Sequence, residues 1–129
     1  MLGRNSFTTD EVRDAKAAVA QQLAAFRGLT DAGAAEGVYF NAMVLALDRR
    51  FVHRVRAVSG KDGNPLNEVE LIADSLMNND GVLRGSTVIR YVPEKSVLGL
   101  AIGDRISLGA DDFERLASGF LAEIESRFC

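Results

Sequence analysis

The residues with the clearest chemical potential surround a short glycine-rich loop near the middle of the chain. The loop runs from Ser59 to Asn64, and its two glycines and its Asp-Gly step favour a turn. A helix is predicted to begin at Pro65, because asparagine is a favoured N-cap and proline suits the first helical position. The amides of that first turn and the helix dipole would together favour a bound anion.

Three basic side chains lie close to this loop in the sequence. Lys61 is within it, and Arg54 and Arg56 precede it. A hypothetical site for a phosphate or a carboxylate would therefore consist of Arg54, Arg56, Gly60, Lys61, Gly63 and Asn64. A simpler interpretation is that the arginines only offset the negative end of their own helix. If they also pair with Glu68 or Glu70, and the asparagine fully caps the next helix, no pocket exists.

Other catalytic and metal-binding patterns are missing from the sequence. His53 is the single histidine and a candidate general base, although such a histidine is more often a surface residue. One histidine and one cysteine, Cys129, do not provide a zinc ligand set. The Walker pattern and the full ligand spacing of a calcium loop are also missing. We therefore expect no metal and no cofactor, and the sequence leaves open whether the protein is an enzyme.

Four amphipathic helices are expected to position these residues. The first spans residues 8–27, where Thr8 and Glu11 form a capping box. The third spans residues 65–78 and the last spans residues 110–128. The side chains expected to be buried are Leu47, Phe51, Val55, Ile72, Leu76, Leu116, Phe120 and Ile124.

The second helix is predicted over residues 37–58. Apolar residues recur there at intervals of three or four, at Phe40, Val44, Leu47, Phe51, Val55 and Val58. Arg49, His53 and Arg56 would lie on the opposite face of such a helix and make it basic. A short strand over residues 51–58 is the competing interpretation, because this stretch is rich in valine.

The character of the sequence changes after Gly81. Residues 87–92 and 105–108 have strand-like composition and are predicted to form a small, antiparallel two-stranded β-ribbon that lies on the helices. The link between them forms an apolar flap that contains Val97, Leu98, Leu100 and Ile102. The predicted fold class is thus mainly α: a bundle of about four helices with a two-stranded β-ribbon (α+β), in a single domain over residues 1–129.

Composition limits the functional classes. The net charge of −3 argues against nucleic-acid binding as the main task, so the basic face is a local feature of an acidic chain. No apolar run approaches the roughly 18 residues of a membrane span. The start of the chain does not resemble a signal peptide, and a lone cysteine excludes a disulfide framework, so we expect a cytoplasmic protein without membrane association.

Three stretches carry a resemblance to known proteins. GKDGNPLNEVELIADSL, NNDGVLRG and PEKSVLGLAIGDRISL resemble segments of small uncharacterised conserved proteins from high-GC actinobacteria. The resemblance covers most of the chain and implies a bacterial, intracellular, single-domain protein. It implies no activity, because that group has no assigned function.

Three functional hypotheses follow. The first is a non-enzymatic domain that binds a partner or associates with itself as a homodimer, since the helix faces and the flap offer more apolar surface than a small monomer can bury. The second is a protein, possibly an enzyme, that binds an anion or a phosphorylated metabolite at the loop 59–65. The third is nucleic-acid binding through the Arg49–Arg56 face.

Overall fold

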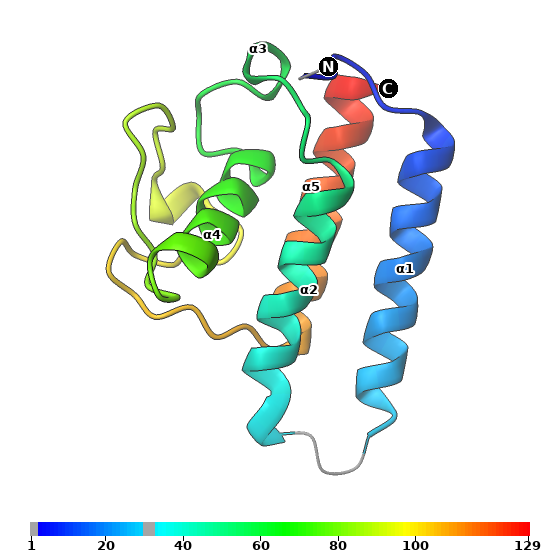
Figure 1. Ribbon diagram of the computed structural model, residues 1–129, viewed down its shortest axis with the longest axis vertical. Coiled ribbons are helices and arrows are strands. Elements are labelled where there is room, and N and C mark those ends of the chain that lie inside the picture. Colours follow the sequence, from blue (N-terminus) through cyan, green and yellow to red (C-terminus); the bar gives the residue numbers. More distant parts are fainter. Residues whose placement is uncertain (1–2, 30–32) are drawn as a thin grey trace.

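The computed structural model describes residues 3–29 and 33–129 of the chain. Within these residues the chain forms five α-helices and two short 3-10 turns (Figure 1). The helices are α1 (Thr9–Arg27), α2 (Glu36–Arg50), α3 (Arg56–Ser59), α4 (Pro65–Asn78) and α5 (Ala110–Phe128), and the turns are η1 (Gly33–Ala35) and η2 (Pro93–Lys95). The mainly helical class is confirmed.

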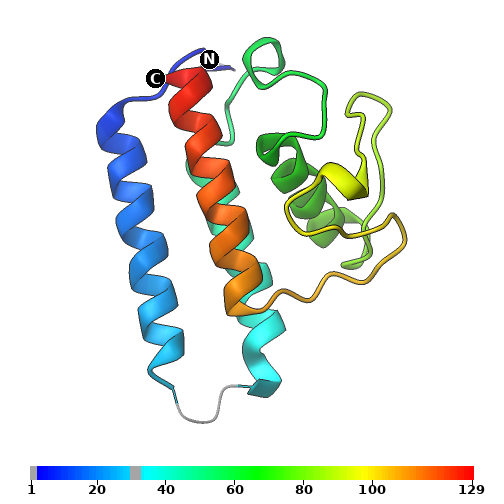
Figure 2. The same ribbon diagram turned by 180° about the vertical axis from the view of Figure 1, so that it is seen from behind.

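The helices α1, α2 and α5 run along the long axis of the molecule. The helix α4 lies on the opposite side of α2 and α5 from α1, and both views agree on this arrangement (Figures 1 and 2). The two ends of the chain meet, because the amide of Phe7 donates to the carbonyl of Phe128 over 3.0 Å. The central pair α2 and α5 is therefore covered by α1 on one side and by α4 on the other.

The capping signals predicted from the sequence are confirmed. Thr8 caps α1, and its side chain and that of Glu11 form a reciprocal capping box. Asn64 caps α4, with Pro65 at the first helical position. The last helix begins at Ala110, whose amide donates to the carboxylate of Glu36 over 2.8 Å. This contact ties the start of α5 to the start of α2.

One apolar cluster joins all the long helices. Phe40 of α2 packs against Phe113 of α5 with ring centroids 5.4 Å apart, and Phe51 packs against Phe120 at 5.8 Å. Six of the side chains predicted to be buried are buried: Leu47, Phe51, Ile72, Leu116, Phe120 and Ile124. The other two, Val55 and Leu76, are half-buried, and Leu76 packs against the cluster.

The prediction of a continuous helix over residues 37–58 is wrong. The helix α2 ends at Arg50, and the competing strand does not form either. The N-terminal segment provides the physical reason, because Arg4 donates its amide to the carbonyl of His53 and accepts from the amide of Val55. These backbone bonds replace the ones that a helix would have made.

The predicted β-ribbon is also wrong, because the described residues contain only single bridging pairs and no strand. Each predicted strand finds another partner. Arg90 bridges to Asp62 in the loop before α4, whereas Arg105 bridges to Val82. The two segments therefore follow separate extended paths over the surface of the helices.

The apolar flap packs on the chain's own core. Val97, Leu98 and Leu100 contact the apolar cluster, and only Ile102 is left largely exposed, at 53%. Glu68 of α4 is buried beneath the flap, and its carboxylate accepts the amides of Val97 and Leu98 at 2.8 and 3.0 Å. The flap is therefore held by backbone bonds as well as by apolar packing.

Candidate functional site

The amides at the start of α4, which were predicted to bind an anion, all have partners within the chain. The side chain of Asn64 accepts the amide of Leu66 over 2.9 Å. Its backbone carbonyl accepts the amides of Asn67 and Glu68 at 3.0 and 2.9 Å. Pro65 has no N–H to offer. No amide of this first turn remains for a ligand.

The loop before α4 is held from inside by a buried asparagine. Asn67 donates to the carbonyls of Gly60 and Asp62 at 3.1 and 2.7 Å. Its own side-chain oxygen accepts from Arg56 over 2.7 Å. Arg56 also forms an ion pair with Glu70, one turn further along α4. Arg56 therefore helps to hold the loop against α4.

The charged side chain of Arg54 is almost fully buried, at 4% exposed. It pairs with Asp48 over 2.8 Å and donates to the carbonyl of Phe51 over 2.9 Å. Its guanidinium also lies 5.0 Å from the centre of the Phe120 ring. Since these partners come from α2, from the turn after it and from α5, Arg54 connects three parts of the fold.

The structure places four of the six predicted anion-site residues in two separate hollows and the other two in neither. Arg54 and Arg56 line a hollow of about 380 Å³ together with Asp48 and Glu70, the carboxylates that pair with them. Gly63 and Asn64 line another hollow, of about 540 Å³. Lys61 is exposed and lines neither of these, and Gly60 accepts from Arg56 and Asn67. The arginines also do not form the basic helical face that was expected, because α2 has ended before them.

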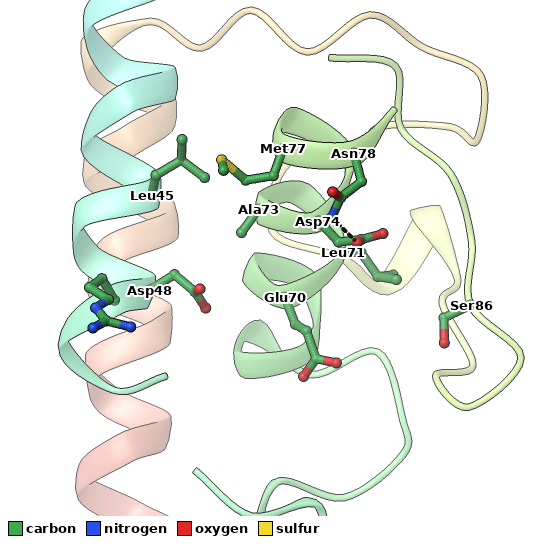
Figure 3. Close-up of a pocket in the computed structure, with 10 residues that line it drawn as sticks. Leu45, Asp48, Glu70, Leu71, Ala73, Asp74, Met77, Asn78 and Ser86 are labelled. Atoms are coloured by element: carbon green, nitrogen blue, oxygen red, sulfur yellow. Dashed lines mark hydrogen bonds between the residues drawn. The ribbon is translucent and has the colours of Figure 1, made fainter. Parts of the chain in front are cut away.

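A hollow of about 660 Å³ lies between α2 and α4. Leu45 on α2 and Met77 on α4 point toward one another across it, with Ala73 beside them (Figure 3). Charged groups surround this apolar centre, among them Asp48, Arg49, Glu70 and Asp74. An apolar centre with a charged rim is the usual composition of a protein-binding surface.

The apolar centre continues along the outer side of α2. Val38 and Leu45 are seven residues apart, which is two helical turns, and so they lie one above the other. Val38 is 76% exposed and Met77 is 67% exposed. We call this surface the α2–α4 face, defined by Val38, Ala42, Leu45, Ala73 and Met77.

The α2–α4 face makes α2 apolar on two sides. Its inner side carries Phe40, Val44 and Leu47, which are buried. The apolar stripe predicted for this helix includes neither Val38 nor Leu45. The signal was present in the sequence, because a helix with apolar residues on both sides is normally covered on both.

The carboxylates at the rim of this face have partners. Hydrogen bonds from Asn78 and then Arg84 hold the pKa of Asp74 below its usual value. Arg49 is exposed and forms no ion pair with the residues that the structure describes. The rim therefore presents charges of both signs.

The other groups considered for chemistry are spread over the surface. His53 is exposed in the turn after α2. Burial raises the pKa of the Cys129 thiol, which donates to the carbonyl of Phe7 over 3.3 Å. Within residues 3–29 and 33–129, no three His, Cys, Asp or Glu side chains are grouped as metal ligands.

Comparisons with protein-family models, with curated proteins and with solved structures gave no match to this chain. None of the helices in the described part of the chain has both the length and the apolar character that crossing a membrane requires.

Proposed function

We propose that this protein is a non-enzymatic, self-associating domain, in which two copies pair through the α2–α4 face. The observation that carries the proposal is that large apolar side chains are exposed on the outer side of α2 and on α4, although the inner side of α2 is already buried. Val38 and Met77 are mostly exposed, and Leu45 points into the hollow between the two helices. Covering them with a second apolar surface would be favourable by about 25 cal/mol for each Å² removed from water.

A second copy suits this face because the face is complementary to itself. It carries the cation Arg49 and the carboxylates Asp48, Glu70 and Asp74 around one apolar centre. A two-fold axis places each patch against the same patch of the other copy, so charges of one sign can meet charges of the other. The seven-residue spacing of Val38 and Leu45 also suits the packing of one helix along another.

The flap, which was predicted to contribute apolar surface to a dimer, supports one less well than the α2–α4 face does. Val97, Leu98 and Leu100 contact the chain's own core, which leaves Ile102 as the exposed apolar residue of the flap. A single exposed side chain is normal on a monomer. Ile102 therefore serves as a control position for the experiment.

The experiment compares the mass of three single variants in solution. Met77→Glu and Val38→Glu each place a charge on the face at a well-exposed position, so the fold should tolerate them. Ile102→Glu makes the same kind of change away from the face. We expect the first two variants to be monomers, and Ile102→Glu to dimerise like the wild type. Loss of the dimer in Ile102→Glu alone would place the interface at the flap and contradict the proposal.

A further inference from the structure

A second hollow, of about 540 Å³, lies on the side of the molecule where the loop before α4 meets the end of α5. Residues 62–65 form one wall, and Arg90, Val92 and Lys95 form another. Glu123 and Arg127 of α5 close it. Arg90 and Lys95 belong to one segment, and Arg127 lies more than thirty residues further along the chain. None of the three is among the site residues predicted from the sequence. The volume is in the range of small-molecule sites, which is about 300–1,000 Å³.

The backbone of each wall is fixed by contacts that the chain makes with itself. The amide of Arg90 donates to the carbonyl of Lys61 over 2.7 Å. The loop also approaches closely at Gly63, where an added Cβ would lie 3.2 Å from the carbonyl oxygen of Arg90. The segment after Lys95 is held by the buried carboxylate of Glu68 through two amides. The backbone that carries the basic side chains is therefore fixed before any ligand binds.

Two cations of this hollow have no ion pair in the described part of the chain, although Arg90 helps the hydrogen bond from Asn64 to lower the pKa of the Asp62 carboxyl. Glu123 forms an ion pair with Arg127 over 2.6 Å, and Arg127 also donates a hydrogen bond to the carbonyl of Ser59. The carboxylate of Asp62 accepts from the side chain of Asn64 over 2.9 Å. Among the described residues, the side chains of Arg90 and Lys95 form no ion pair. The hollow is thus locally cationic on a chain whose net charge is −3.

We propose that this hollow binds the phosphate group of a small metabolite, with Arg90 and Lys95 as its charged ligands. A guanidinium offers a planar fork of donors that matches phosphate oxygens, and an ammonium adds a compact charge. Arg127 forms the fixed side of the site. This site is separate from the α2–α4 face and does not depend on self-association. It also differs from the site predicted at the loop, because it uses neither Arg54 nor Arg56 and leaves the first-turn amides of α4 capped.

The experiment measures the melting temperature in inorganic phosphate and in ribose 5-phosphate, with ribose as the uncharged control and sodium chloride to match ionic strength. We expect both phosphates, but not ribose, to raise the melting temperature of the wild type. Arg90→Ala and Lys95→Ala should each weaken binding roughly tenfold, since each removes one charge-assisted contact. Lys61→Ala is the matched control, because it removes an exposed cation next to the hollow and should leave the response unchanged.

Isothermal titration of the same four proteins with ribose 5-phosphate checks that the shift reports binding. The wild type and Lys61→Ala should bind alike, whereas Arg90→Ala and Lys95→Ala should bind more weakly. A flat response of the wild type to both phosphates would overturn the proposal. So would equal binding by all four proteins, or a loss confined to Lys61→Ala, which would place the anion on the outer side of the loop.

Discussion

Two regions of the molecule differ in how far the rest of the chain covers or pairs their side chains. The joint, by which we mean residues 51–67, is rich in polar groups, and it satisfies most of them within the chain. The α2–α4 face is apolar, and it leaves Val38 and Met77 mostly exposed. The residue types of the joint suit chemistry and predicted a ligand site, whereas no residue of the α2–α4 face was predicted to bind a partner.

This difference shows that residue type alone does not reveal where a surface is available. A buried polar group that lacks a partner costs about 1–3 kcal/mol, so folding tends to pair such groups with each other. Asn67 is an example, because its side chain bonds to the loop and to Arg56. The terminal nitrogens of Arg54 are also paired, whereas its Nε and the hydroxyl of Ser59 are buried without a hydrogen-bond partner among the described residues. Met77, by contrast, is mostly exposed, because no other part of the described chain covers it. The α2–α4 face is therefore a better candidate for a binding surface than the joint is.

The largest loss of stability is expected from a substitution in the core that lies next to the joint. Phe120 is fully buried under the guanidinium of Arg54 and against Phe51. Phe120→Ala should lower the free energy of unfolding by about 3–5 kcal/mol, because it removes apolar contacts and leaves a cavity. Urea denaturation measures the change, with Ile102→Ala as the exposed control away from the α2–α4 face. A loss under about 1 kcal/mol would mean that the core beneath the joint is not tightly packed.

A slightly smaller loss is expected from the buried ion pair. Arg54→Ala leaves the carboxylate of Asp48, which is 20% exposed, without its cation. The free energy of unfolding should fall by about 3 kcal/mol, the lower end for a broken buried pair. Arg50→Ala removes an exposed arginine at the end of α2 that is not part of the α2–α4 face, and it should change stability by under about 0.5 kcal/mol. Equal losses in the free energy of unfolding for the two substitutions would show that the ion pair of Arg54 stabilises the fold no more than an exposed arginine does.

Glu68 should produce a pH dependence of stability. Burial beneath the flap raises its pKa above 4.5, the value of an unperturbed glutamate, although the amides of Val97 and Leu98 lower it in part. A raised folded-state pKa means that this stabilising contribution is fully present below pH 4.5 and is lost as the pH rises through the folded-state value. The free energy of unfolding of the wild type, relative to Glu68→Gln, should therefore fall as the pH rises above 4.5.

The comparison with Glu68→Gln is needed because another carboxyl acts in the opposite direction. Hydrogen bonds from Arg4 and then Thr8 lower the pKa of Glu11 to about 2, so its contribution is lost as the pH falls below 4.5. Both proteins contain Glu11, and its effect cancels in the difference between their urea denaturation curves. A difference that stays constant from pH 4.5 to neutral pH would show that Glu68 ionises alike in the folded and unfolded chains.

Local signals in the sequence were sufficient to predict much of the helical framework. The caps at Thr8 and Asn64 and the start of α5 depend on neighbouring residues, and these predictions are confirmed. The end of α2 depends on backbone bonds between Arg4 and the segment 53–55, which are distant in sequence. Propensity cannot show such a contact, and so the helix was predicted to be too long.

The predicted strands and the candidate site depended on similar long-range partners. Residues 87–92 have the composition of a strand, but Arg90 pairs with the loop before α4 and not with residues 105–108. The same pairing brings Arg90 next to Gly63. The arginine that lines the hollow was therefore invisible to an analysis of neighbours along the chain, whereas Gly63 and Asn64 were identified.

The most direct test of the central claim is sedimentation equilibrium on the wild type and on Met77→Glu. The wild type should have twice the chain mass of 13.9 kDa at high protein concentration, and Met77→Glu should have the mass of one chain. The free energy of unfolding of the isolated Met77→Glu chain should stay within about 0.5 kcal/mol of the wild-type monomer, since the residue is 67% exposed. A wild type of 13.9 kDa at every concentration would contradict self-association through the α2–α4 face.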